Sequence, residues 1–296
     1  MRVAVLGPGG VGGLIAAALA RAGDDVTIVA RESTAQLIAR DGISVQSVTL
    51  GDFVGRPAAA ATLTSEVDAL IVATKSVGLE AALDRVEIEP PFVLPLLNGL
   101  DHLALLRRRF APESVAAGAI RVESDRPRPG VVVHTSPFLR VDMAGPPGLA
   151  APMAELAELL AGAGIPARVL DSEPQVMWAK LVRLNALACT TSAWDVELGA
   201  IREDPERRVV LEAAIREAAA VARAEGADIP DEKAMDELES AHATLGSSMQ
   251  RDIAAGREPE LDAIPGAVLR AGARHGLACP TIESLVAQIE ARIAAL

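Results

Sequence analysis

A cluster of glycines near the start of the chain has the spacing that holds a phosphate group. Three of its glycines fit the pattern G-x-G-x-x-G, which follows an apolar run and opens a stretch typical of a helix. The first glycine makes a tight turn, the second lets the backbone approach a pyrophosphate, and the third lets the helix pack closely on the strand. The N-terminus of a helix also favours anions. The sequence therefore predicts a dinucleotide-binding loop, whose residues are Gly7, Gly9, Gly10, Val11 and Gly12.

The residue after the second apolar run indicates which dinucleotide is bound. This run, Asp25–Ala30, is typical of a strand, and Arg31 follows it directly. A guanidinium suits the 2′-phosphate of NADP, whereas proteins that bind NAD place an acidic residue there for the ribose hydroxyl. Glu32 comes next and could contact a ribose instead, which leaves NAD as the alternative. We expect NADP as the cofactor, with Arg31 on its 2′-phosphate.

Lysine is rare in this chain, and its rarity singles out candidates for proton transfer. Of the 28 basic residues only Lys75, Lys180 and Lys233 are lysines. Arginine serves wherever a positive charge is enough, so a lysine indicates a need for an amine that can release a proton. Reduction of a ketone leaves an oxyanion, and a lysine ammonium can both neutralise it and donate the proton.

Elements that position these residues can be predicted from the hydrophobic pattern. Short apolar runs predict buried strands at 2–6, 25–30, 69–73, 92–96 and 114–119. A further pair of strands is expected at 130–134 and 138–145, joined by a turn at Thr135–Pro137. After a helix at 150–162 the pattern turns almost wholly helical, with helices expected at 173–189, 206–225, 231–244, 260–275 and 281–294. We expect an α/β Rossmann-type N-terminal domain over residues 1–170 and an all-α C-terminal domain over residues 171–296.

The composition argues against several classes of protein. A net charge of −12 over 296 residues argues against nucleic-acid binding, which needs a basic surface. No apolar run reaches the roughly 18 residues of a membrane-spanning helix, and no signal-peptide pattern is present, so we expect a cytoplasmic protein that does not enter the membrane. Two cysteines form no disulfide framework, and no residue cluster has metal-ligand spacing. The long helices of the second half suit a homodimer interface or a monomer core equally well.

Four further stretches complete a recognisable set of motifs. They are "ATKSVG" around Lys75, "LLNGLDH" around Asn98, "MWAKL" around Lys180, and "SSMQRDIAAGREPELDAIPG" from Ser247. Together with the glycine loop and Arg31, they resemble the ketopantoate reductase (2-dehydropantoate 2-reductase) family, in the family's order along nearly the whole chain. The resemblance implies reduction of a 2-keto acid to a 2-hydroxy acid with NADPH, as in pantothenate biosynthesis.

The resemblance also assigns roles to individual residues. It implies that Lys180 is the catalytic lysine and that Glu260 binds substrate. By the same match, Ser248 holds the substrate carboxylate, Asn98 lies near the nicotinamide and the substrate, and Lys75 lies on the cofactor side. We expect these residues in a cleft between the domains, at the carboxyl ends of the parallel strands.

One helix departs from the family pattern. Family members usually carry asparagines four and eight residues after the catalytic lysine, on one face of the helix. This chain has Leu184 and Ala188 there, and Asn185 lies about 100° further around the helix, so that only a distorted helix would bring it to the site. The substrate is therefore expected to be 2-dehydropantoate or, for a paralogous NAD(P)-dependent dehydrogenase, a less polar 2-keto acid. A non-catalytic NADP sensor is the third alternative.

Overall fold

The computed structural model describes all 296 residues, whose contacts divide the chain into two units. The first unit comprises Met1–Leu97 and His102–Val176, and the second comprises Asn98–Asp101 and Met177–Leu296. The division falls within helix α6 (Glu173–Trp194), close to the change of pattern at residue 171. None of the helices is both long and apolar enough to span a lipid bilayer.

The first unit is built on a parallel sheet of five strands, four of which lie at predicted apolar runs, whereas the run predicted at 114–119 corresponds to a strand of another sheet. The strand order is β5-β2-β1-β6-β7, and every neighbouring pair is parallel. The strands are β1 (Val3–Leu6), β2 (Val26–Val29), β5 (Ala58–Ala60), β6 (Ala69–Val72) and β7 (Val93–Pro95). The unit's helices are α1 (Gly10–Ala22), α2 (Glu32–Asp41), α3 (Leu79–Leu83), α4 (His102–Arg109) and α5 (Ala150–Gly162). This arrangement is Rossmann-like, and the carboxyl ends of all five strands lie along one edge.

Two smaller sheets complete the first unit. One sheet has the order β4-β3-β10-β9 and the other β12-β11-β8. The strands of the first are β3 (Ile43–Ser47), β4 (Phe53–Gly55), β9 (Ser124–Arg128) and β10 (Val131–His134). The strands of the second are β8 (Ala117–Arg121), β11 (Arg140–Ala144) and β12 (Ala167–Val169). The two strands predicted at 130–134 and 138–145 are present as β10 and β11, and they lie in different sheets and do not pair with each other.

Ser136 explains why the segment between β10 and β11 is not a hairpin turn. Its hydroxyl is fully buried, accepts a hydrogen bond from the backbone N–H of Glu123 and donates one to the carbonyl of Phe138. The buried Ser136 side chain therefore anchors an otherwise exposed segment, which passes the chain from one sheet to the next.

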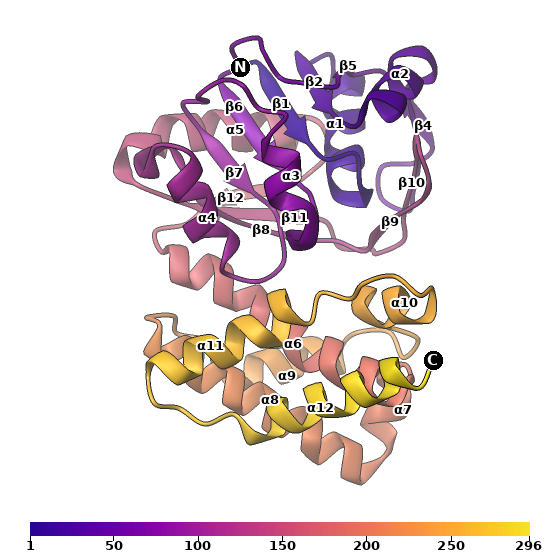
Figure 1. Cartoon of the computed structure of the whole chain (residues 1–296), viewed down its shortest axis with the longest axis vertical. Helices are drawn as coiled ribbons and strands as arrows, with labels where there is room; N and C mark the ends of the chain where they lie inside the picture. Colours follow the sequence, from indigo (N-terminus) through magenta and orange to yellow (C-terminus); the bar gives the residue numbers. More distant parts are fainter. The chain divides into compact units, whose positions relative to one another are not determined.

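The second unit is a set of helices (Figure 1). They pack around a core of mostly aliphatic side chains. Besides α6, its helices are α7 (Leu198–Glu203), α8 (Pro205–Ala224), α9 (Asp231–Glu239), α10 (Ser248–Ala254), α11 (Ala267–Arg274) and α12 (Pro280–Ala294). Helix α8 packs against α7, α9, α11 and α12. Cys189 and Cys279 are free thiols in this core, as expected, and burial raises the pKa of Cys189 to about 12 and that of Cys279 to about 11.

A buried histidine makes the stability of the first unit depend on pH. His134 is 1% exposed, with Nδ1 2.8 Å from the hydroxyl of Ser47 and Nε2 3.1 Å from that of Ser136. Burial lowers the pKa of His134 below its ordinary value of 6.5, against the opposing effects of the Phe138 backbone and the Glu123 charge. Between the lowered pKa and 6.5, the unfolded chain binds more protons than the folded chain. Stability is therefore expected to fall as the pH drops below about 6.5.

His134→Gln tests this expectation. In denaturant titrations between about pH 7.5 and about pH 5.5, the variant should lose less free energy of unfolding with falling pH than the wild type. His242→Gln, which changes an exposed histidine, is the matched control and should keep the wild-type slope. Equal slopes for the wild type and His134→Gln would show that another group carries the pH dependence.

Candidate active site

Three of the predicted site residues form a continuous hydrogen-bonded chain in the second unit. Lys180 Nζ donates to Asn98 Oδ1 at 2.8 Å, and Asn98 Nδ2 donates to Glu260 Oε2 at 2.8 Å. Glu260 is only 6% exposed, and the other two residues are partly buried. The structure thus brings together side chains separated by up to 162 positions in the sequence. We refer to Lys180, Asn98 and Glu260 as the amide-bridged triad.

The bridging amide has a defined orientation. The Asn98 oxygen faces the lysine and the Asn98 NH₂ group faces the carboxylate. In the reverse orientation the NH₂ group would face the Lys180 ammonium, donor against donor, and the oxygen would face the Glu260 carboxylate, acceptor against acceptor. The amide therefore links a cation to an anion and holds the amine in one direction. Among side chains of this length, only a group with both a donor and an acceptor can make this link, so a carboxylate or an aliphatic side chain at position 98 would break it.

Each member of the triad is positioned by a different local structure. Lys180 lies on α6 between the buried residues Trp178 and Leu181, which anchor that turn of the helix. Asn98 follows β7, and Gly99 after it has φ +85°, a conformation that favours glycine. A Cβ atom on Gly99 would lie 2.0 Å from the carbonyl oxygen of Ala263, so the loop lies directly against the turn that follows Glu260.

The turn after Glu260 corrects a prediction. The sequence predicts one helix over 260–275, whereas the structure has a π-helical turn, Asp262–Gly266, followed by α11. Pro265 has no N–H to donate, and the N–H of Gly266 instead reaches the carbonyl of Leu261 at 2.9 Å. The wider turn brings the Ala263 carbonyl against the Asn98 loop.

Ser248 lies outside the hydrogen bonds of the triad. It is the exposed first residue of α10, and the preceding Ser247 caps the helix by accepting from the N–H of Gln250 at 3.0 Å. The Ser247 hydroxyl also lies 2.9 Å from that of Thr191, eleven residues along α6 from Lys180. These buried contacts fix where α10 begins and so where the Ser248 hydroxyl lies. No sequence pattern indicates that Thr191 and Ser247 contact each other, because they lie 56 positions apart in the chain.

The face of α6 beyond Lys180 is apolar. The helix runs unbroken from Glu173 to Trp194, so Leu184 and Ala188 follow Lys180 on one face. Asn185 is fully buried, and its Oδ1 accepts from Cys189 Sγ at 3.6 Å. Because α6 is not distorted, Asn185 does not replace the two amides that the family pattern places on this face.

The glycine loop of the first unit has room for an anion. Gly7 has φ +104°, and a Cβ atom on Gly12 would lie 2.0 Å from the Gly7 carbonyl oxygen, so the turn and the close helix packing both require glycine. A Cβ atom on Gly9 would meet only the Ala73 carbonyl, at 3.8 Å. Helix α1 has no side-chain cap and no acidic residue in its first turn. Its free N–H groups therefore fit the pyrophosphate of a dinucleotide.

The other predicted cofactor residues lie at or after the strand ends next to this loop. A Cβ atom on Gly7 would lie 2.8 Å from the Ala73 carbonyl, and Lys75 comes two residues after that contact. Val11 is half-buried in the first turn of α1. Gly10 has a packing role, because a Cβ atom there would lie 2.4 Å from the Ser124 carbonyl of β9, whose hydroxyl donates to the Gly10 carbonyl at 2.9 Å.

Arg31 and Glu32 differ in how their side chains are engaged. Arg31 is exposed at the start of α2, directly after β2 and Ala30. Glu32 Oε1 accepts a hydrogen bond from Gln36 Nε2 at 2.6 Å, one turn along the same helix. The Glu32 carboxylate therefore lies along the surface of α2, whereas no contact of this kind holds the Arg31 guanidinium to the helix.

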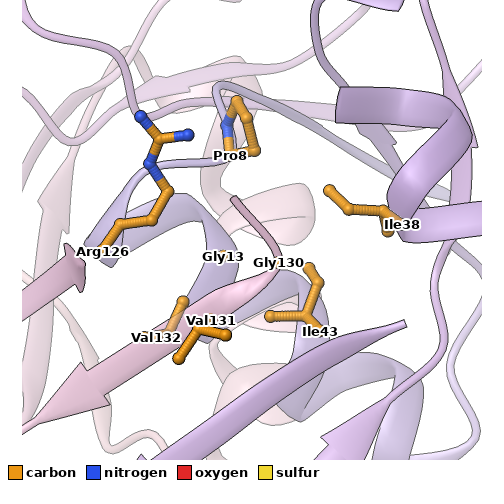
Figure 2. Close-up of a pocket in the computed structure, with 8 residues that line it drawn as sticks. All are labelled: Pro8, Gly13, Ile38, Ile43, Arg126, Gly130, Val131 and Val132. Atoms are coloured by element: carbon orange, nitrogen blue, oxygen red, sulfur yellow. The ribbon is translucent and has the colours of Figure 1, made fainter. Parts of the chain in front are cut away.

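A small hollow beside the glycine loop has mainly apolar walls (Figure 2). It is lined by Pro8, Gly13, Ile38, Ile43, Arg126, Gly130, Val131 and Val132. A Cβ atom on Gly13 would lie 2.8 Å from Val132, so the hollow marks close packing of α1 on β10. Arg126 is its single charged lining residue, and the hollow therefore lacks the set of polar groups that a substrate carboxylate needs.

Comparison with known proteins gives matches along nearly the whole chain. A model of the family described as ketopantoate reductase PanE/ApbA matches residues 3–143, and one of its C-terminal domain matches residues 174–293. The chain is 31% identical to 2-dehydropantoate 2-reductase of Caulobacter vibrioides over 98% of both sequences. Among solved structures, 2-dehydropantoate 2-reductase of Geobacter metallireducens GS-15 has a TM-score of 0.91 at 28% identity, over 99% of this chain and 100% of that one. D-mandelate dehydrogenase with NADH and anilino(oxo)acetate shares the fold, with a TM-score of 0.90 at 22% identity over 100% and 99%.

Proposed function

The chain belongs to the ketopantoate reductase family of oxidoreductases, which act on CH–OH groups, and we propose that it reduces 2-dehydropantoate to pantoate with NADPH. The amide-bridged triad carries this proposal, because it holds an amine in a fixed direction beside a buried carboxylate. Such a group can deliver a proton to an oxyanion. The match to relatives named 2-dehydropantoate 2-reductase supports the choice of substrate.

The residues that would hold the cofactor are those of the glycine loop, together with Arg31 and Lys75. When bound, NADPH supplies the hydride that reduces the keto carbon of the substrate. The glycine loop contributes free N–H groups at the start of α1 for the pyrophosphate. Arg31 contributes a positive charge suited to the 2′-phosphate, and Glu32 competes little for the ribose because Gln36 engages it.

Lys180 acts as the general acid in the proposed reaction. Its ammonium donates a hydrogen bond to the keto oxygen, which gains negative charge as the carbon is reduced. One N–H bond of Nζ breaks and the new O–H bond of the product alcohol forms, leaving a neutral amine that takes a proton from water. Asn98 holds Nζ in place throughout, and Glu260 fixes the amide and contacts substrate. Ser248, at the exposed start of α10, would bind the substrate carboxylate.

A less polar 2-keto acid is the second candidate substrate. Leu184 and Ala188 remove two amides from the α6 face that carries Lys180, and Asn185 is buried in the core instead. An apolar face favours a substrate with an aliphatic or aromatic group in place of the hydroxymethyl arm of 2-dehydropantoate.

A panel of 2-keto acids tests the proposed function. The decrease in NADPH absorbance is followed with 2-dehydropantoate, with branched aliphatic 2-keto acids and with phenyl-substituted 2-keto acids. Highest kcat/KM for 2-dehydropantoate supports the proposal, and highest kcat/KM for an apolar member supports the second candidate. Tight NADPH binding with no turnover of any member contradicts both and favours a sensor.

Cofactor choice is tested with Arg31→Ala. Loss of a charge-assisted contact to the 2′-phosphate should weaken NADPH binding by roughly 10- to 100-fold, while NADH binding changes little. The measurement is the dissociation constant of each cofactor by fluorescence titration. Glu32→Gln is the companion variant and should leave both affinities near the wild-type values. An equal loss of both cofactors in Arg31→Ala would remove the 2′-phosphate argument.

A further inference from the structure

Arg270 connects the two segments that carry Asn98 and Glu260. Its Nη2 donates to Asp101 Oδ2 at 2.5 Å, three residues after Asn98. Its Nη1 donates to Asp262 Oδ1 at 2.6 Å, and its Nη2 to the Asp262 backbone carbonyl at 2.8 Å, two residues after Glu260. All of these residues belong to the second unit. A single guanidinium thus bridges the Asn98 loop and the π-helical turn.

The bridge made by Arg270 lies close in sequence to a tight backbone contact between the Asn98 loop and the π-helical turn. The Gly99 position meets the Ala263 carbonyl, while Asp101 and Asp262 are drawn together by the arginine. These two contacts support a third, the 2.8 Å hydrogen bond from Asn98 to Glu260, which belongs to the amide-bridged triad. A planar guanidinium suits this task, because its fork of donors fixes the direction of several acceptors at once.

The exposure of the bridge argues against a role in overall stability. The side chains of Arg270, Asp101 and Asp262 are 42%, 53% and 89% exposed. Ion pairs this exposed contribute little to the free energy of unfolding. A single cation between two carboxylates, Asp101 on the loop and Asp262 on the turn, can nevertheless select one loop position over its neighbours, which requires far less energy than holding the fold.

We propose that Arg270 is a positioning residue for the amide-bridged triad, which it acts on through Asp101 and Asp262. This inference rests on the proposed function, since its catalytic consequence is the placement of the Lys180 amine through Asn98. Loss of the bridge lets the Asn98 loop move away from Glu260, and a displacement of about 1 Å at a catalytic group can lower the rate about a hundredfold.

Arg270→Gln, which keeps a long polar side chain but removes the charge and the fork, is the test variant. Arg274→Gln is the matched control, because Arg274 is the next basic residue of α11 and pairs with Glu225 instead. We expect kcat of Arg270→Gln to fall at least about tenfold with a smaller change in KM, and its melting temperature to match that of Arg274→Gln. Asp101→Asn should lower kcat in the same direction, and combining it with Arg270→Gln should add little further loss.

Amide hydrogen exchange of residues 98–101 gives a readout that is independent of turnover. Exchange in this segment should be faster in Arg270→Gln than in the wild type, and unchanged in Arg274→Gln. Unchanged exchange in Arg270→Gln overturns the proposal, as does faster exchange with wild-type kcat in an active enzyme. If the wild type reduces no 2-keto acid, the proposed function fails, and the exchange measurement alone decides whether Arg270 positions the loop.

Discussion

Replacing Lys180 with alanine is expected to lower kcat by at least about a hundredfold, the usual scale of general acid catalysis. The amine that donates to Asn98 Oδ1 at 2.8 Å is then lost, and no other lysine occurs in the triad. Binding of NADPH should change little, because the residues proposed to hold it belong to the first unit. The measurements are steady-state kinetics and a cofactor titration on the same preparation.

Lys233→Ala is the matched control for this variant. Lys233 is an exposed lysine of α9, and its removal changes the net charge by the same amount. It should retain wild-type kcat. Lys180→Arg adds a second comparison, since it keeps a positive donor that does not release a proton, and it should remain strongly impaired. Near-normal turnover in Lys180→Ala would refute the proposed role of the amine.

Replacing Gly99 with alanine should have the second largest effect, with kcat lowered by roughly ten- to a hundredfold. Two causes act together. Alanine is strained at φ +85°, and its Cβ would lie 2.0 Å from the backbone oxygen of Ala263, which is not the flexible end of a side chain. The loop must shift to relieve the overlap, and Asn98 shifts with it. Kinetics on protein shown to be folded by circular dichroism provide the measurement.

Gly276→Ala separates the two causes. Gly276 also has a positive φ, +67°, but a Cβ atom there would meet nothing within 4 Å. This variant carries a similar backbone strain without the overlap, and its kcat should stay close to that of the wild type. If both variants lose activity equally, general destabilisation of the second unit explains the result and the Asn98 loop does not.

Strong local patterns predicted the parts of the fold that position the cofactor loop. The runs at β1, β2, β6 and β7 are apolar, and the structure has a strand at each of them. The short strands between residues 43 and 60 escaped prediction for a physical reason. β5 consists of three alanines, which favour helix in isolation, and only its pairing with β2 makes it a strand.

In two places distant residues decide what the local pattern leaves open. The two strands around the turn residues 135–137 are present as predicted, but their partners could not be inferred locally, since β10 pairs with β3 and β9 whereas β11 pairs with β8 and β12. The π-helical turn also looks like ordinary helix from its apolar periodicity. Its conformation depends on Pro265 and on packing against Gly99, which lies far away in the sequence.

The candidate site could be named from the sequence but not assembled from it. Motif resemblance selected Asn98, Lys180 and Glu260 one by one. Their joining through an amide has no sequence signal, because the partners are 82 and 162 positions apart. Arg270 and Asp101 were missed for the same reason, since each looks like an ordinary surface charge until the structure pairs them.

Asn98–Asp101 belong to the second unit although the residues on both sides of them belong to the first. This interruption limits which segments could be swapped between this chain and its relatives to make a chimaera. A crossover at residue 176 would inherit the lysine and the glutamate from one parent and the asparagine from the other. Such a chimaera would keep the loop in place only if the parent that supplies the asparagine has glycine at position 99, against the backbone carbonyl of residue 263, and if residue 101 of that parent complements residue 270 of the other. Residues 98–101 and residues 260–270 should therefore be exchanged together, even though they lie far apart in the sequence.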